Sequence, residues 1–182
     1  SVYPYQPEGL WEQLATRNAV NYVQQHGDSL YRRSLYTIWK RTSPPPNMIS
    51  LDAPERNFCT VRRQKTSTPL QALILLNDPQ FAEAGRMLAE FMVKLGGTSV
   101  AERIQYGFRR LTSRPPDDKE LSILQNLFNT EYSRFQSDPT LASEVLTVGE
   151  FPADTSLAPA EVAAYAVLAS TLLSFDERVI KR

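Results

Sequence analysis

Apolar side chains recur at helical spacing through residues 79–95. One face of the predicted helix carries Phe81, Ala84, Leu88, Phe91, Met92 and Leu95. The other face carries Glu83, Arg86, Glu90 and Lys94, which are three or four residues apart, as neighbours on a helix surface are. This pattern predicts an amphipathic helix with its apolar stripe toward the core and its charges opposite. Gly96 and Gly97 end it.

Capping signals predict further helices in the second half of the chain. Ser99 and Glu102 have capping-box spacing, and Pro115 and Pro116 precede acidic residues suited to the positive end of a helix dipole. The inward positions of these two helices are Val100, Ile104, Phe108 and Leu111, then Leu121, Leu124, Phe128, Tyr132 and Phe135. A shorter helix is expected over 141–148.

Residues 159–175 are apolar on nearly every side except at Glu161. A helix that is apolar all round is a buried one. Pro159 opens this segment, and its many alanines allow neighbouring helices to approach closely. We predict that it is the central helix of the fold.

The first third of the chain is less regular. Short helices are predicted over 9–16, with Trp11 inward, and over 31–42, with Tyr31, Leu35 and Ile38 inward, although the β-favouring residues of 31–42 also suit a strand. Three consecutive prolines predict polyproline-like backbone at 43–48 and an irregular ordered loop onward to 63. Thr68 and Pro69 then start a helix with Leu70, Leu73 and Ile74 inward, which ends at 77–79.

These elements predict a mainly α fold, an irregular orthogonal bundle of about six to seven helices with a long ordered Pro/Arg-rich loop. The length of 182 residues fits a single domain over 1–182. The opening SVYPYQPEGLW has no initiator Met, so we expect a fragment of a longer protein. The longest apolar run, 162–175, is shorter than the about 20 residues that a bilayer requires, so no membrane span is expected.

Charge is distributed unevenly along a chain that is neutral in total. Residues 31–66 hold eight of the twenty Lys and Arg but two of the twenty acids, interleaved with Tyr31, Tyr36, Trp39 and Phe58. Residues 111–182 carry an excess of acids instead. The neutral total argues against a dedicated nucleic-acid binder, which usually has a strongly basic domain.

Two accounts of the basic stretch remain open. Guanidinium groups beside aromatic rings suit anionic groups on a flat ligand, such as a sulfated or uronic-acid polysaccharide. The candidate ligand-binding or partner-binding residues are Arg32, Arg33, Tyr36, Trp39, Lys40, Arg62 and Arg63. Alternatively, Arg56, Arg62 and Arg63 pair with acids and carbonyls, and so anchor an irregular loop.

Signals for catalysis are weak. Asp52, Arg56 and Cys59 form the one cluster that could serve an enzyme, with other domains of the full-length protein completing the site. Cys59 is the single cysteine; a free cysteine is usually buried and inert, which is the favoured interpretation here. His26, the single histidine, precedes Gly27 and Asp28 in a predicted surface turn. Motifs for a metal or for a cofactor are absent from the sequence.

Several segments carry a family resemblance. YRRSLYTIWKRTSPPP and LDAPERNFCTVRRQKTSTPLQALILLNDPQF resemble the signature of a domain of unknown function first described in planctomycetes. The resemblance extends to SVYPYQPEGLW, RIQYGFRRLTSRPPDDKEL and LLSFDERVIKR, so it covers nearly all of the chain. Departures from the pattern occur at Leu51 and at 174–177.

The resemblance implies an architecture rather than a chemistry. Its members resemble exported proteins, periplasmic or extracellular, that place this domain at the C-terminal end and a cytochrome c-like domain near the start. Haem is therefore expected in another domain and not in this chain, and other domains of the same polypeptide are expected partners. The family has a suspected link to polysaccharide use. It has no established catalytic residues, so none is carried over.

Overall fold

The computed structural model describes residues 1–7, 9–11, 22–62 and 65–179. The chain forms two compact units, Ser1–Gln71 and Ala72–Arg182, which we call the N-terminal and C-terminal units. The boundary falls within helix α2 (Pro69–Asn77). The expected single domain stays a prediction, because two compact units of one chain can still unfold together.

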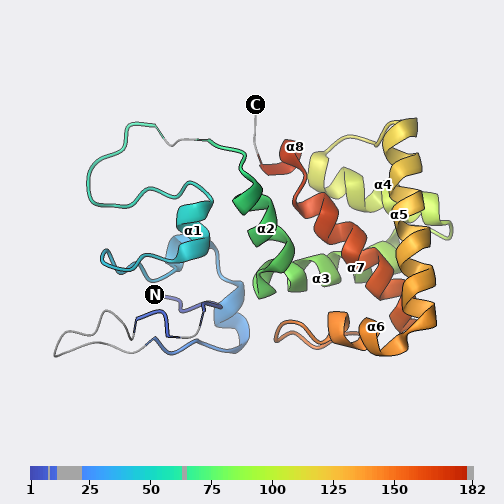
Figure 1. The fold of residues 1–182 in the computed structure, drawn as a ribbon, viewed down its shortest axis with the longest axis horizontal. Helices are drawn as coiled ribbons and strands as arrows, with labels where there is room; N and C mark the ends of the chain where they lie inside the picture. Colours follow the sequence, from blue (N-terminus) through green and yellow to red (C-terminus); the bar gives the residue numbers. More distant parts are fainter. Residues whose placement is uncertain (8, 12–21, 63–64, 180–182) are drawn as a thin grey trace. The chain divides into compact units, whose positions relative to one another are not determined.

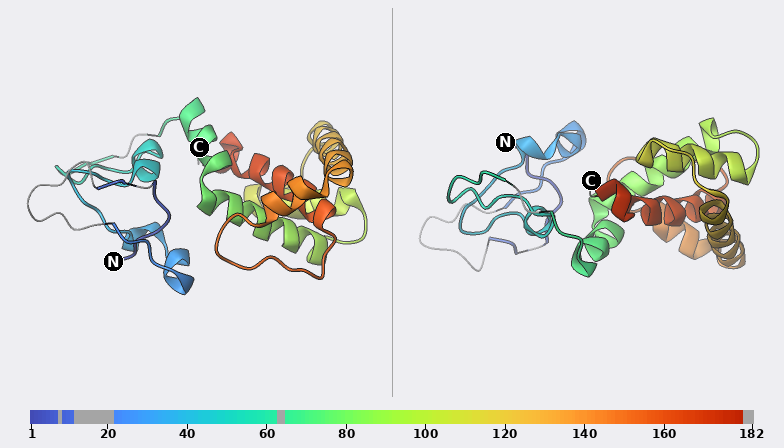
Figure 2. Two further views of the ribbon diagram at one scale, coloured as in Figure 1. Left: turned by 60° about the horizontal axis from the view of Figure 1, so that its bottom comes forward. Right: turned by 90° about the horizontal axis from the view of Figure 1, so that it is seen from above.

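The C-terminal unit is a helical bundle built around α7 (Pro159–Leu173). α3 (Pro79–Leu95), α5 (Asp118–Ser137) and α6 (Pro139–Leu146) make the most extensive contacts with α7, as the views of Figures 1 and 2 show. α4 (Val100–Thr112) packs on α3 and α5, and the short α8 (Asp176–Val179) follows α7. The predicted central, buried helix and the mainly α fold are confirmed.

Close packing around α7 depends on its small residues. Ala163, Ala164 and Ala169 are fully buried, so neighbouring helices approach the α7 backbone. On α3, a Cβ added at Gly85 would lie 2.5 Å from Ser170 Oγ of α7. The glycine and the alanines together permit the short distance between these two helices.

Side-chain caps set the starts of α4, α5 and α6. Ser99 and Glu102 form the predicted capping box at α4, and Asp117 and Glu120 form another at α5. Each pair satisfies two backbone N–H groups that the first turn leaves without partners. α6 begins at Pro139, two residues earlier than predicted, because Asp138 caps it through the backbone N–H of Thr140.

The predicted orientation of α3 is wrong on its charged face. Leu88 and Met92 are buried as expected, but Glu83, Arg86 and Glu90 are buried as well. Phe91 and Leu95 are exposed instead. The reason is tertiary, because the loop at 149–154 hydrogen-bonds with these three charged side chains.

The inward face of α2 also differs from the prediction. Leu70 and Leu73 are exposed, whereas Gln71 and Leu75 are buried. α2 itself has the predicted bounds, from Pro69 to Asn77. Gln71 is buried because its side chain completes a hydrogen-bond cluster in the N-terminal unit, described below.

The N-terminal unit is mostly irregular. Its described residues form short 3-10 turns, η2 (Gly27–Tyr31) and η3 (Ser34–Tyr36), and a short helix, α1 (Pro46–Ser50). Backbone hydrogen bonds join Val2 to Tyr36 and Ile38. Val2, Trp11 and Leu30 are buried, and the rings of Tyr3 and Tyr22 meet Trp11 edge-on.

Two predictions for this unit are wrong. Residues 31–42 form no α-helix, because the chain at Thr37 runs beside Val2 in a parallel bridge, and Tyr31 and Leu35 are exposed. The polyproline prediction fails at Pro46, which begins α1, since proline suits the first helical turn. The helix predicted at 9–16 lies largely outside the described residues; Trp11 is buried as expected.

Extended structure in the described residues is limited to two isolated bridges, Val2 with Thr37 and Lys40 with Ser43. The helices in this same part of the chain lack the combination of length and apolarity that a membrane crossing requires. His26 is exposed beside the turn η2, as the sequence predicts.

Candidate ligand-binding hollow

Asp52 organises the loop that follows α1. Its backbone is left-handed (φ 61°), which directs the chain away from the helix axis. Its carboxylate accepts hydrogen bonds from the Thr66 backbone N–H (2.7 Å), the Thr66 hydroxyl (2.9 Å) and the Gln71 amide (3.2 Å). One side chain thus ties the start of the loop to its end.

Gln71 joins this cluster to the start of α2. The Thr68 backbone N–H donates to Gln71 Oε1 (3.1 Å), and the Gln71 backbone N–H donates to Thr68 Oγ1 (3.3 Å). This reciprocal pair is a capping box with Gln in place of Glu. The loop is therefore anchored by Asp52, Thr66 and Gln71.

Arg56 and Arg62 do not take the anchoring role that the sequence left open for them. Arg56 and Arg62 are exposed, and in the described residues neither forms an ion pair with an acid. Arg63 lies outside the described residues.

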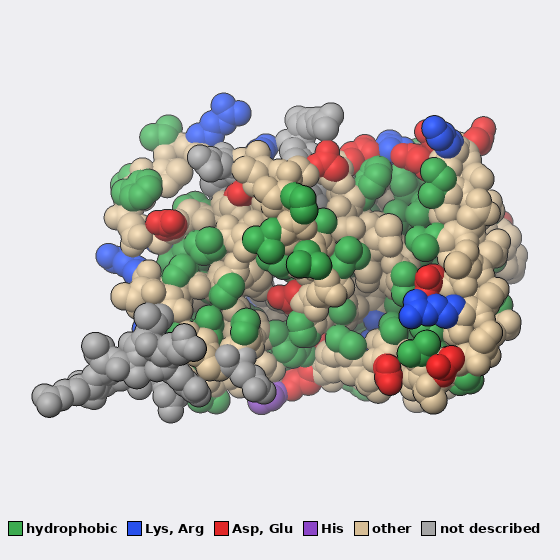
Figure 3. Space-filling view, viewed as in Figure 1, with side chains coloured by type: hydrophobic (Ala, Val, Ile, Leu, Met, Phe, Trp, Pro, Cys, Tyr) green, Lys and Arg blue, Asp and Glu red, His purple; other side chains and the backbone are tan. Residues whose placement is uncertain are grey.

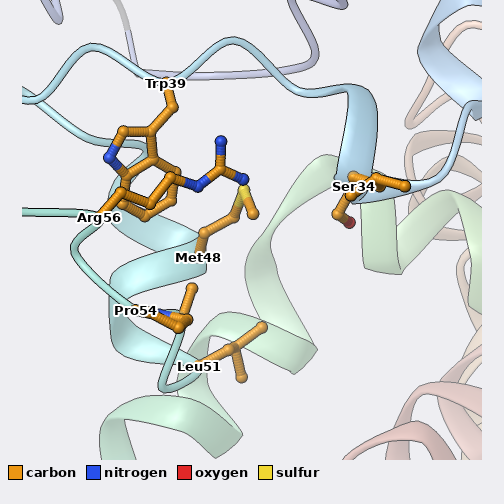
Figure 4. Close-up of a pocket in the computed structure, with 8 residues that line it drawn as sticks. Ser34, Trp39, Met48, Leu51, Pro54 and Arg56 are labelled. Atoms are coloured by element: carbon orange, nitrogen blue, oxygen red, sulfur yellow. The ribbon is translucent and has the colours of Figure 1, made fainter. Parts of the chain in front are cut away.

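An open hollow of about 400 Å³ lies in the N-terminal unit between η3 and the loop after α1 (Figure 4). The hollow is mainly apolar. Its lining residues are Ser34, Leu35, Trp39, Met48, Leu51, Ala53, Pro54 and Arg56. Such a site, apolar with a few placed polar groups, is the usual form of a ligand pocket.

Among the described residues, Arg56 is the one cationic side chain that lines the hollow. Its guanidinium carbon lies 4.7 Å from the centre of the Trp39 ring, within the range of a cation–π interaction. Figure 4 shows the Arg56 side chain lying along the Trp39 ring, with Met48 beside it. Trp39 Nε1 donates to the carbonyl of Glu55 (3.1 Å), so the ring is fixed to the residue that precedes Arg56.

Backbone strain also lies at this site. Arg56 has φ 61°, a left-handed conformation that costs a non-glycine residue roughly 1–2 kcal/mol. Strained residues persist where their surroundings fix them, and they gather at functional sites. The left-handed backbone at Arg56 turns its side chain back over the Trp39 ring.

The remaining predicted residues lie elsewhere in the unit. The Arg32 guanidinium is 5.9 Å from the Tyr36 ring centre, and Lys40 Nζ is 4.7 Å from the Trp11 ring centre. Arg33 is exposed. The hollow therefore combines Trp39 with Arg56 rather than gathering all of the candidate residues.

The three weak catalytic candidates do not line one site. Asp52 faces Thr66 and Gln71, and Arg56 faces the hollow. Cys59 is exposed, so its predicted burial is wrong; the irregular segment 55–62 has all of its side chains exposed. Groups of His, Cys, Asp and Glu that could hold a metal ion were not found among the described residues.

Sequence reasoning missed the apolar lining from Met48, Leu51 and Pro54. Their positions in a proline-rich segment carry no periodic signal, so only the folded loop brings them to Trp39. Sequence reasoning also missed the buried charges of α3.

Those charges form a polar cluster in the C-terminal unit. Arg86 donates to Glu90 Oε1 (2.9 Å) and to the carbonyl of Phe151 (2.5 Å). Glu83 accepts from the backbone N–H groups of Glu150 and Phe151 (both 3.1 Å). The cluster fastens an irregular loop to α3, which is a structural role.

The loop is held further along by Asp154. Lys94 Nζ lies 2.5 Å from Asp154 Oδ2, and Asp154 Oδ1 accepts from the backbone N–H of Ser156 (2.8 Å). The Lys94 ammonium and the Ser156 donors hold the pKa of Asp154 well below its usual range. Asp154 therefore keeps its charge in moderately acidic solution.

Comparison with known proteins agrees with the resemblance noted in the sequence. Residues 1–128 match the family PSD1, described as a protein of unknown function (DUF1553). The match includes all of the N-terminal unit and runs through the first half of α5. No curated protein and no solved structure matches the chain. Since the match covers well over half of the chain, the protein belongs to the PSD1 family of unknown function.

Proposed function

We propose that this protein is a binding module and that the hollow at Trp39 and Arg56 takes an anionic group of a polysaccharide. The observation that carries the proposal is the stacking of an exposed Arg56 on Trp39 at the edge of an apolar hollow. A carboxylate or sulfate would occupy the guanidinium fork, and a sugar ring would lie over the apolar lining.

The geometry favours binding because the cation is already oriented. The Trp39 ring holds one face of Arg56, and the Trp39 indole is itself held by the Glu55 carbonyl. A preoriented guanidinium loses less conformational entropy when an anion binds than a mobile one does.

A role as part of an enzyme active site is the alternative, with Asp52, Arg56 and Cys59 as its residues. The Asp52 carboxylate accepts hydrogen bonds from Thr66 and Gln71. Transferring a proton through Asp52 would disrupt the cluster that closes the loop. This cost supports a structural role for Asp52.

The family resemblance extends the proposal beyond this chain. In the extended proposal, the protein is exported and haem belongs to another domain of the same polypeptide. That haem domain is a partner of this one. A polysaccharide ligand suits an exported module. Nucleic acid is disfavoured as a ligand by the neutral total charge.

Calorimetry with matched polymers tests the proposal. Dextran sulfate and polygalacturonate should bind, whereas uncharged dextran should not. Arg56→Ala should weaken binding by roughly 10-fold to 100-fold, the range expected when a hydrogen-bonded ion contact of about 1.5–3 kcal/mol is lost. Arg134→Ala, which removes an exposed arginine of α5, should leave affinity unchanged.

Two results would contradict the proposal. One is equal binding of dextran and dextran sulfate, which would show that the negative charge of the polysaccharide does not contribute to binding. The other is equal loss of affinity in the Arg56 and Arg134 variants, which would indicate nonspecific attraction rather than a site.

A further inference from the structure

The segment 56–62 exposes large apolar side chains. Phe58 keeps 73% of its surface exposed, and Val61 is fully exposed at 104%. Both lie in irregular backbone between two exposed arginines, Arg56 and Arg62. Hydrophobic and basic side chains project from the outer loop of this unit, at the upper left of the space-filling view (Figure 3).

The shape of this surface limits what can cover it. Phe58 and Val61 project from a loop and do not line the hollow. A protein partner would need a complementary cavity for each side chain, whereas the headgroup region of a bilayer accepts projecting apolar side chains directly.

The charge of the segment agrees with an anionic lipid surface. The stretch 31–66 holds eight basic residues against two acids, and Arg56 and Arg62 are at the two ends of the apolar segment. Arginines in such positions place their stems along acyl chains and their guanidinium groups at lipid phosphates.

We propose that residues 56–62 form an interfacial loop that docks the N-terminal unit on an anionic lipid surface. Phe58 and Val61 enter the headgroup region and Arg62 contacts phosphates, whereas Arg56 stays with Trp39 at the hollow. Insertion is shallow, because the backbone of this irregular loop must keep hydrogen bonds to water and to headgroups. This docking is separate from the polysaccharide site, which depends on the hollow.

Cys59 provides a direct probe. It is the single cysteine of the chain, it is exposed, and it lies between Asn57 and Val61 in the loop. An environment-sensitive fluorophore attached to it through a maleimide reports the polarity around the loop tip without any substitution.

Vesicles of phosphatidylglycerol and phosphatidylcholine in equal parts should shift the emission of this label to the blue. Vesicles of phosphatidylcholine alone should not. Phe58→Ser with Val61→Ser should weaken binding at least about tenfold, since two apolar side chains no longer enter the interface. Arg62→Gln should weaken it by about fivefold, as expected for the loss of one cation near the surface.

The matched control is Leu95→Ser with Ile123→Ser. These residues of the C-terminal unit are exposed at 62% and 59%, so they remove comparable apolar surface. The affinity of this double variant for the vesicles should stay within about twofold of that of the unchanged protein.

Other outcomes would overturn the proposal. If vesicles that contain phosphatidylglycerol cause no blue shift of the label, the loop does not dock on an anionic lipid surface. If the Leu95 and Ile123 variant loses as much affinity for the vesicles as the Phe58 and Val61 variant, the binding is nonspecific. A shift with dextran sulfate that Phe58→Ser with Val61→Ser abolishes would assign the loop itself to a glycan. A shift produced by higher protein concentration without vesicles would assign it to a second copy of this chain.

Discussion

Single residues decide how the loop at 149–154 is held in the C-terminal unit. Gly149 has φ 94°, a conformation that side chains other than glycine's rarely adopt. An added Cβ there would also collide with the carboxylate of Glu83. That carboxylate is itself fixed by the N–H groups of Glu150 and Phe151, so it cannot move without releasing the loop.

Gly149→Ala should therefore lower the free energy of unfolding by about 1–3 kcal/mol, since strain and collision act together. Urea denaturation followed by circular dichroism measures this. Gly27, in the N-terminal unit, also has positive φ (67°) but no atom within 4 Å of an added Cβ. Gly27→Ala, followed by Trp fluorescence, therefore gives the cost of the backbone conformation alone. Equal costs in the two variants would contradict the role of Glu83.

Arg86 is the second decisive residue at this scale. Its side chain is 1% exposed and it holds both Glu90 and Phe151. Arg86→Met should lower the free energy of unfolding by about 3–5 kcal/mol, because it leaves the buried Glu90 carboxylate without its cation. The matched control is Arg134→Met, where an exposed pair with Glu131 is lost; it should cost less than about 1 kcal/mol. A small loss of stability in the Arg86 variant would show that the polar cluster does not hold the loop at 149–154 on α3.

At the scale of elements, Arg114 joins three helices. It follows the C-cap of α4 and forms ion pairs with Glu120 in the first turn of α5 and with Glu177 of α8. Glu120 also accepts from the backbone N–H of Asp117 (2.8 Å) as part of the capping box. The same carboxylate thus caps one helix and connects it to two others.

This arrangement predicts a pH dependence of stability. The hydrogen bonds from Arg114, and then that from Asp117, lower the pKa of Glu120 from 4.5 to about 2. Because the folded pKa is the lower one, this stabilisation is complete above about pH 5 and is lost as the pH falls toward 2.

Glu120→Gln should make the free energy of unfolding less dependent on pH between about 5 and 2. Thermal melts at several pH values in this range measure how steeply stability changes with pH. Glu144→Gln, at an exposed position of α6, is the control and should change the slope less. An unchanged slope in the Glu120 variant would exclude this carboxylate as the source.

At the scale of the molecule, the two units differ in how they are stabilised. The C-terminal unit buries a continuous apolar core, whereas the described residues of the N-terminal unit bury few side chains and depend on hydrogen-bond clusters such as that of Asp52. A small buried core gives little stability. The N-terminal unit should therefore be the less stable of the two.

The placement of the tryptophans allows a test. Both, Trp11 and Trp39, belong to the N-terminal unit, whereas most of the helix lies in the C-terminal unit. We expect Trp fluorescence to change at a lower urea concentration than the far-UV circular dichroism. Coincident transitions would instead support the single cooperative domain predicted from the sequence.

Much of the C-terminal unit could be predicted because its signals are local. The capping boxes at Ser99 and Asp117 and the apolar run of α7 depend on near neighbours in the chain. In the candidate site, Trp39 and Arg56 could be singled out as an aromatic and a cation in a basic stretch. Their contact could not, because it requires the left-handed turn at Arg56.

The sequence by itself determined the helical class, most of the helix bounds and the central position of α7, because spacing and caps act within one or two turns. Only the tertiary structure decided that Glu83, Arg86 and Glu90 face inward and that Asp52 closes the loop through Thr66 and Gln71. The physical reason is the same in both cases. A buried polar side chain needs partners, and here those partners, the loop at 149–154, Thr66 and Gln71, are distant in the chain.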